Sequence, residues 1–84
     1  MPTISIFYGI CIMMYLRDKE HNPPHIHAFY GGQSASFLIA SGEVLEGAFP
    51  KNAKKLVKEF ITKYRDELFR MWETGIILRL KGID

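Results

Sequence analysis

The chain is organised around residues 21–32, which read HNPPHIHAFYGG. All three histidines of the 84-residue protein fall in this stretch, two adjacent prolines separate the first histidine from the second, and a double glycine closes it. A residue before proline is pushed away from helical geometry, so the diproline predicts an extended segment that leads into a strand over 25–30. Gly31-Gly32 then predicts a tight hairpin turn, because such turns need positive φ.

The apolar pattern predicts three further strands, over 9–16, 33–40 and 43–46. In the first of them both alternating sets of side chains are apolar, so we expect this strand to be central in the sheet or covered on both faces. The apolar run from Ile4 to Leu16 is interpreted as one buried strand, because it is too short to span a bilayer as a helix. Gly9 predicts a bulge or a close backbone approach. Together these segments predict a four-stranded antiparallel β-meander.

After Pro50 the apolar period changes from two to about 3.6 residues, which predicts a helix over 51–74 that packs on the sheet. Its apolar stripe consists of Ala53, Leu56, Val57, Phe60, Ile61, Tyr64, Leu68 and Met71. One long helix is the main prediction, a break near Arg65 is the alternative, and Gly75 is the expected C-cap. The apolar run 76–80 either returns as a short final strand or forms a partner-binding tail. The predicted fold class is therefore α+β.

Size and composition favour one globular domain over residues 1–84, because chains divide only beyond roughly 200 to 300 residues. Cys11 is the single cysteine, which excludes an internal disulfide and indicates a reducing compartment, with the cytoplasm as the default. No Lys or Arg precedes the first apolar run, so neither a signal peptide nor a membrane role is expected. The net charge of +2 is uneven: residues 50–84 carry nine basic and five acidic side chains. An anionic partner would therefore meet the C-terminal part.

The histidines are candidate metal ligands. Residues two apart on a strand project from one face, so His25 and His27 are expected to lie on the same side, and His21 can fold back across the diproline as a third ligand. Three ligands around a divalent transition metal, with one open position, would activate a bound water molecule. The structural alternative is that the histidines hydrogen-bond to neighbouring backbone and hold the turn against the sheet.

A metal-free hydrolase or ribonuclease is a further hypothesis for the same segment. Histidine has an unperturbed pKa of about 6.5, so His25 and His27 are suited to proton transfer near neutral pH. Arg17, in the preceding loop, would stabilise phosphate charge in such a site. Tyr15 or Tyr30 would serve as an acid or as a stacking platform.

Two surfaces of the predicted helix and tail are candidate binding sites. Lys51, Lys54, Lys55, Lys58 and Arg65 lie within about 100° of one another, opposite the apolar stripe. A solvated helix face is the plain interpretation, and nonspecific, salt-dependent contact with RNA or DNA is the sharper one.

An apolar patch of four residues is the candidate surface for a protein partner or a homodimer. It consists of Phe69, Ile76, Ile77 and Leu78. Phe69 falls off the helical stripe, so we expect it to be exposed near the apolar tail.

Several motifs together carry a family resemblance. They are Pro2–Ser5, Phe7–Ile10, Met14-Tyr15, His21–His25 with His27-Ala28, Tyr30-Gly31 and Gly42–Gly47. With a weaker match that continues to Trp72, the chain resembles, over about residues 2–73, the small bacterial family labelled domain of unknown function 4160. Lys19-Glu20 lengthens the loop before His21, and the apolar tail replaces the Pro- and Lys-rich ending that is usual in this family.

The resemblance implies a compact α+β domain of prokaryotic or phage origin, often encoded beside a small gene of the domain of unknown function 2442 family. Such pairs are suspected to be toxin–antitoxin-like modules, so the implied partner is the protein encoded by the neighbouring gene. The functional prediction is thus a cytoplasmic interaction module that binds a protein partner and contacts nucleic acid. The alternative is a histidine-centred hydrolase or ribonuclease, with or without a metal.

Overall fold

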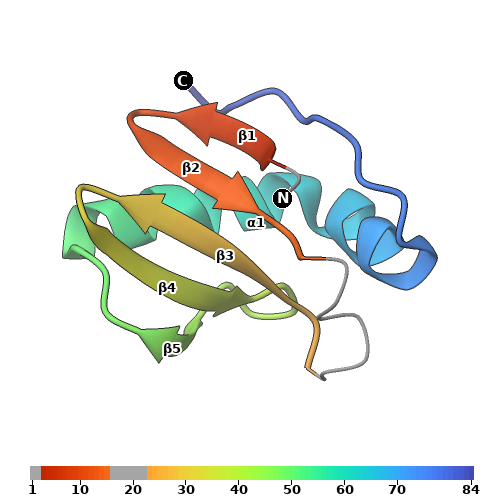
Figure 1. The fold of residues 1–84 in the computed structure, drawn as a ribbon, viewed down its shortest axis with the longest axis horizontal. Helices are drawn as coiled ribbons and strands as arrows, with labels where there is room; N and C mark the ends of the chain where they lie inside the picture. The colour runs from red at the N-terminus through yellow and green to blue at the C-terminus, as the bar shows by residue number, and fades with distance from the viewer. Residues whose placement is uncertain (1–2, 16–22) are drawn as a thin grey trace.

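A computed structural model, which describes residues 3–15 and 23–84, contains one antiparallel sheet and, within these residues, one helix (Figure 1). The strands are β1 (Thr3–Phe7), β2 (Ile10–Met13), β3 (His25–Tyr30), β4 (Gln33–Leu38) and β5 (Val44–Gly47), and the helix is α1 (Lys51–Thr74). The strands lie side by side in chain order from β1 to β5. The predicted α+β fold, an antiparallel meander followed by a C-terminal helix, is confirmed, but the sheet has five strands and not four.

The additional strand arises because the first apolar run is a hairpin. Tyr8 and Gly9 both have positive φ, 49° and 77°, and Phe7 pairs with Ile10 across them. The interpretation of the run from Ile4 to Leu16 as one strand was therefore wrong: the strand predicted over 9–16 forms as β2, and β1 precedes it as a separate strand. Gly9 lies in the turn between them and not in a bulge, and the register instead shifts between Thr3 and Ser5. An apolar run without alternation carries no mark of a turn, and a tyrosine seldom occupies a positive-φ position.

The hairpin at Gly31-Gly32 forms where the sequence predicts it. Both glycines have positive φ, 53° and 83°, and the register runs without a break from His25 opposite Leu38 to Tyr30 opposite Gln33. This unbroken register places His27 directly opposite Ser36.

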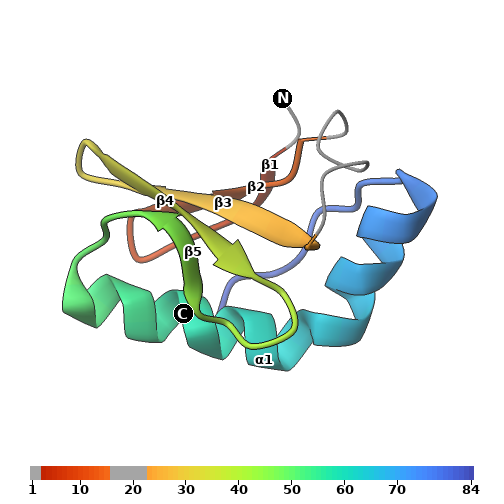
Figure 2. The same cartoon turned by 90° about the horizontal axis from the view of Figure 1, so that it is seen from below.

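The core lies between α1 and one face of the sheet (Figure 2). Side chains from the sheet, such as Ile12 and Ile26, are fully buried, and Phe7 stacks on Phe60 of the helix with ring centroids 5.0 Å apart. The predicted apolar stripe of α1 is confirmed. Its buried members are Ala53, Val57, Phe60, Ile61, Leu68 and Met71.

A kink divides α1 into two halves. Tyr64 has non-helical backbone angles, φ −114° and ψ 22°, within the continuous span Lys51–Thr74, which agrees with a break near Arg65. Beyond the kink the second half of the helix turns up beside the end of the sheet where β3 begins (Figure 2). There the Trp72 ring lies 5.1 Å from the ring of His25.

The helix ends at Gly75, which has the left-handed conformation and whose N–H donates to the Met71 carbonyl. The residues that follow run past β1, and the Leu80 N–H donates to the Ile4 carbonyl at 2.7 Å. No strand forms among the described residues 76–84, so the predicted final strand is absent there, and the segment instead makes this backbone hydrogen bond and packs Ile77, Leu80 and Ile83 against the core. Among the described residues, no helix combines the length and apolar character needed to cross a membrane.

Candidate functional site

His25 and His27 lie together on the sheet face opposite the one that carries the core residues Ile26 and Ala28, and the second half of α1 reaches this face through Trp72. Their ring centroids are 5.2 Å apart in an edge-on arrangement. Nδ1 of His25 lies 2.8 Å from the Pro23 carbonyl oxygen, which can only accept, so this nitrogen carries a proton and donates. The His25 side chain is 9% exposed and packs against Trp72. This geometry is what the structural alternative predicts for His25, because the ring ties the diproline turn to the helix end.

His27 belongs to a polar row that crosses three strands. It pairs with Ser36 on β4, and Ser36 pairs with Glu46 on β5. The Ser36 hydroxyl and His27 Nδ1 are 3.4 Å apart, and the Tyr15 ring lies 4.4 Å from the His27 ring. A hollow of about 270 Å³ opens between His27, Ser36 and Glu46. Such a polar lining can bind water or a small polar ligand.

The pairing order in this row does not build a serine-type nucleophile site. In a Ser-His-acid triad the imidazole lies between the hydroxyl and the carboxylate, so that one ring nitrogen takes the proton and the other is oriented by the acid. Here Ser36 lies between His27 and Glu46. The row therefore lacks the order in which a carboxylate orients the imidazole and the imidazole activates the hydroxyl.

Two of the three predicted metal ligands are described. His21 and Arg17 lie outside the described residues, so their predicted roles stay predictions. Within residues 3–15 and 23–84, no group of three His, Cys, Asp or Glu side chains lies close enough to hold a metal ion. His25 does have the orientation common in metal sites, where Nδ1–H donates to a carbonyl and Nε2 is the ligating atom.

Four of the five predicted nucleic-acid contacts gather on one surface. Lys51, Lys54, Lys55 and Lys58 are exposed and line a single hollow of about 310 Å³ between α1 and the loop before β5. Arg65 differs, because its side chain is half-buried and its Nε donates to the Ile39 carbonyl at 2.9 Å. The helical projection placed Arg65 on the lysine face. In the structure its side chain instead binds the backbone of Ile39, the residue that follows β4.

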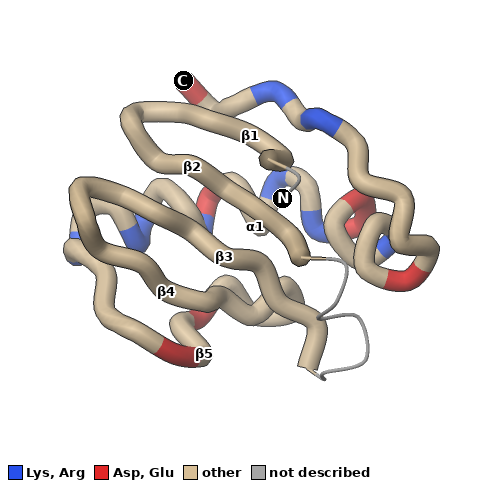
Figure 3. Tube along the Cα trace, viewed as in Figure 1, with Lys and Arg blue, Asp and Glu red and all other residues tan. Residues whose placement is uncertain are grey.

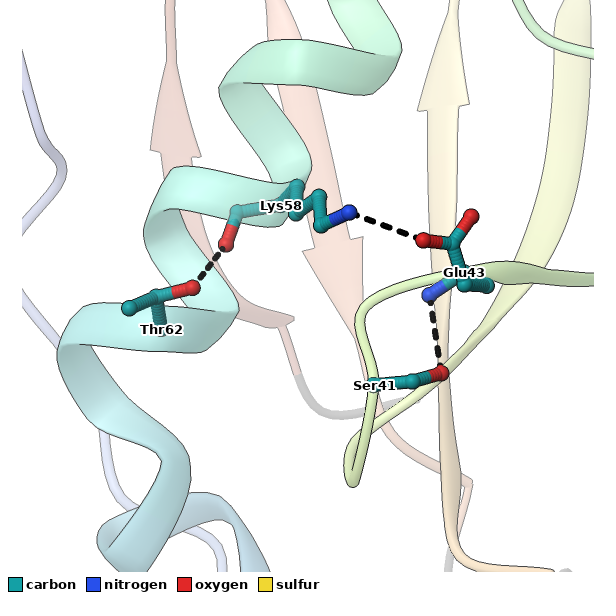
Figure 4. Close-up of polar contacts among 4 residues, drawn as sticks. All are labelled: Ser41, Glu43, Lys58 and Thr62. Atoms are coloured by element: carbon teal, nitrogen blue, oxygen red, sulfur yellow. Dashed lines mark hydrogen bonds and ion pairs between the residues drawn. The ribbon is translucent and has the colours of Figure 1, made fainter.

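An ion pair attaches the lysine face to the loop before β5. Lys58 Nζ donates to Glu43 Oε1 at 2.8 Å, while the Glu43 N–H donates to Ser41 Oγ at 3.2 Å (Figure 4). The pKa of Glu43 is lowered, first by the hydrogen bond from Lys58, then by the charge of Lys58 and, to a smaller extent, that of Lys54. Glu43 therefore neutralises part of the positive surface.

The predicted apolar patch divides into two pairs. Phe69 and Ile77 are half-buried and pack against the core, so the expectation that Phe69 is exposed was wrong. Ile76 and Leu78 are 64% and 58% exposed, the highest values among the large apolar side chains of the described residues. These two line a hollow of about 220 Å³ together with Met71.

Sequence reasoning missed two contributors to these surfaces. Lys63 lines a hollow of about 730 Å³ with Lys55 and Lys58, and Tyr8 lines one of about 500 Å³ with Lys51. Lys63 follows Lys58 by five residues, so it lies outside the i, i+3 and i+4 spacing that relates the other lysines, and that spacing gave no signal for it. Nothing local marks Tyr8, because its neighbours come from β3 and α1.

The chain belongs to the family described as Domain of unknown function (DUF4160), whose model matches residues 9–73. The resemblance inferred from the motifs is thus confirmed. No curated protein and no solved structure matches the chain. The matched residues contain the histidine segment and the lysine face, whereas Ile76 and Leu78 follow the matched region.

Proposed function

We propose that this protein is an interaction module, one half of a toxin–antitoxin-like pair, and that it binds the small protein encoded by the neighbouring gene. The observation that carries the proposal is the apolar hollow formed by Met71, Ile76 and Leu78 at the end of α1. Two exposed apolar side chains beside a buried methionine form the kind of concave apolar site that anchors a partner side chain.

The surroundings of the hollow suggest the chemistry of its partner. Met71 is 2% exposed. Because a methionine side chain is unbranched and has three rotatable bonds, it can adapt to an inserted apolar group. Glu67 and Arg70 lie at the same hollow and supply one charge of each sign. A fitting partner therefore presents a Leu, Met or Phe side chain flanked by a basic and an acidic residue, because unlike charges at a rim orient two proteins.

Co-purification with the neighbouring gene product tests this proposal. Replacing both Ile76 and Leu78 by Ser removes the apolar walls, and we expect at least a tenfold loss of affinity by calorimetry, because central apolar anchors contribute about 2 kcal/mol or more. Leu45→Ser is the matched control, since Leu45 is 40% exposed and lies on β5. Circular dichroism confirms that each variant is folded.

Three results would contradict the proposal. They are unchanged binding by the double variant, equal weakening by the Leu45 control, and a wild-type homodimer that the double variant converts to a monomer in light scattering. The last result would make a second copy the occupant. Expression of each gene alone and together tests the toxin–antitoxin relation, which predicts that one product arrests growth and the other restores it.

A histidine-centred hydrolase or ribonuclease is the second candidate, because His27 lines a polar hollow with Ser36 and Glu46. On this alternative, His27→Ala abolishes RNA or ester cleavage while partner binding persists. Ser36→Ala removes the hydroxyl that contacts His27 and serves as the companion variant.

A further inference from the structure

We propose that the first half of α1, with Tyr8 and Tyr30 beside its start, forms a binding track for single-stranded nucleic acid. This inference goes beyond partner binding and does not depend on it, because the track and the apolar hollow at the other end of α1 share no residue. Its lysines, here called the lysine track, are Lys51, Lys54, Lys55, Lys58 and Lys63.

Three neighbouring hollows make the lysine track continuous. Lys51 lines both the hollow that contains the tyrosines and the hollow beside the loop before β5. Lys55 and Lys58 line that second hollow and also the third, which Lys63 extends. From Lys51 to Lys63 the helix rises by about 18 Å at 1.5 Å per residue. That length matches about five phosphates of a stacked strand at 3.4 Å each.

Two exposed tyrosines stand at one end of this track. Tyr8 is 56% exposed and Tyr30 is 38% exposed, and both line a hollow of about 500 Å³ with Lys51. They come from the tips of two different hairpins. These tips lie close together, since a Cβ atom added to Gly9 would lie 3.4 Å from the Tyr30 ring. The Phe49 ring also lies near the Tyr30 ring, with ring centroids 6.3 Å apart in a tilted arrangement. Exposed aromatic rings beside a cationic groove are the combination that binds unpaired bases.

The distribution of charge favours a phosphate backbone along α1. The five strands contain one charged residue, Glu46, whereas the first half of α1 carries five lysines and a single acid, Glu59 (Figure 3). Lysines that neutralise phosphates release counterions, which gives salt-dependent affinity. Stacking on tyrosine requires bases that are not already paired, so the ligand class is single-stranded RNA or DNA and not a duplex.

Fluorescence anisotropy of the full chain with labelled oligonucleotides tests this inference. The probes are RNA and DNA strands of about 12 nucleotides with one mixed sequence, together with the corresponding duplexes. We expect tighter binding to the single strands, and the RNA and DNA arms show which backbone is preferred. Binding of the duplexes as tightly as the single strands, or no binding at about 50 mM salt, would overturn the proposal.

Variants then separate stacking from charge. Tyr8→Asn keeps a residue that tolerates positive φ, and we expect at least a roughly fivefold loss of affinity with an unchanged salt dependence. Lys51→Gln with Lys54→Gln should reduce the slope of log K against log salt by about 1.4, since each phosphate contact on a single strand contributes about 0.7. An unchanged affinity in Tyr8→Asn, or an unchanged slope in the lysine variant, would contradict the proposal.

Two single-charge variants complete the test. Glu43→Gln releases Lys58 from its ion pair, and we expect binding to become about twofold tighter or more, with a steeper salt dependence. Arg79→Gln is the control for net charge, because Arg79 is exposed in the tail and lines none of the three hollows. An equal loss of affinity in Arg79→Gln would show that total charge and not the track attracts the oligonucleotide, and would overturn the inference.

Discussion

The two halves of α1 bury one continuous apolar stripe, but their solvent-exposed surfaces have net charges of opposite sign. Before the kink at Tyr64, residues 51–63 carry five lysines and one glutamate, a net charge of +4. After it, residues 65–74 carry two arginines and three acids, a net charge of −1, and lead into the exposed Ile76 and Leu78. The buried side of this helix is therefore continuous across the kink, while its solvent side changes from a positive surface to one that is slightly negative and leads into exposed apolar residues.

Each half also contacts a different part of the sheet. The first half touches the loop before β5 through the Lys58–Glu43 ion pair, and the second reaches the start of β3 through Trp72 and His25. Changes in one half should therefore alter one surface and leave the other intact.

Trp72→Ala should give the largest loss of stability. Trp72 is 6% exposed and packs against His25, and its removal leaves a cavity at the junction of helix and strand. We expect the free energy of unfolding in urea to fall by about 3 to 5 kcal/mol. Replacing Lys51, Lys54 and Lys55 by Gln should change it by only about 0.5 kcal/mol per site. A comparable loss in the lysine variant would show that the first half is stabilised through its solvent face.

Arg65→Met tests the junction between the halves. The variant keeps the apolar stem but leaves the Ile39 carbonyl without its Nε–H donor, so we expect a loss of about 1 to 3 kcal/mol in urea unfolding. Lys55→Met is the control, because it removes the same charge from an exposed position. If Arg65→Met weakens oligonucleotide binding as much as Lys55→Met does, then Arg65 belongs to the basic surface that the helical projection assigned to it.

Gly75→Ala should act on the second half alone. Gly75 has φ 75°, and an L residue in that conformation costs about 1 to 2 kcal/mol. Because Gly75 sets the direction of Ile76 and Leu78, partner affinity should fall while oligonucleotide affinity stays unchanged. Gly75→Asn is the matched control, since Asn adopts the left-handed C-cap more readily. Weakened oligonucleotide binding would show that the two surfaces are coupled.

The parts of the fold that could be predicted have a local signal. The helical period predicted α1 and its apolar stripe, and two adjacent glycines predicted the hairpin between β3 and β4. Strand alternation predicted that His25 and His27 lie on one face. The first hairpin was missed because the side chains around Tyr8 are apolar on both faces, so no change of period marks the turn.

The missed features of the candidate sites depend on contacts between distant segments. Phe69 falls off the stripe of a straight helix, yet it lies beyond the kink at Tyr64 and packs against the core. Arg65 lies on the lysine side of a straight helix, but it bonds to Ile39, 26 residues away in the chain. A helical projection shows which side a residue faces and not what lies there.

The Lys58–Glu43 ion pair should give the smallest effect, visible as a pH dependence of stability. Because the pKa of Glu43 is lowered in the folded protein, its contribution is fully present above the ordinary value of 4.5 and is lost as the pH falls through the lowered pKa. Glu43→Gln should therefore lower the melting temperature slightly at neutral pH and not in acid.

The same change in a Lys58→Gln background should have almost no pH-dependent effect, because the hydrogen bond and the charge of Lys58 are the largest causes of the shift. Salt should reduce the neutral-pH difference, since both side chains are exposed and their attraction is screened. A difference that persists in acid, or that survives in the Lys58→Gln background, would show that the Glu43 side chain stabilises the protein through a contact other than its ion pair with Lys58.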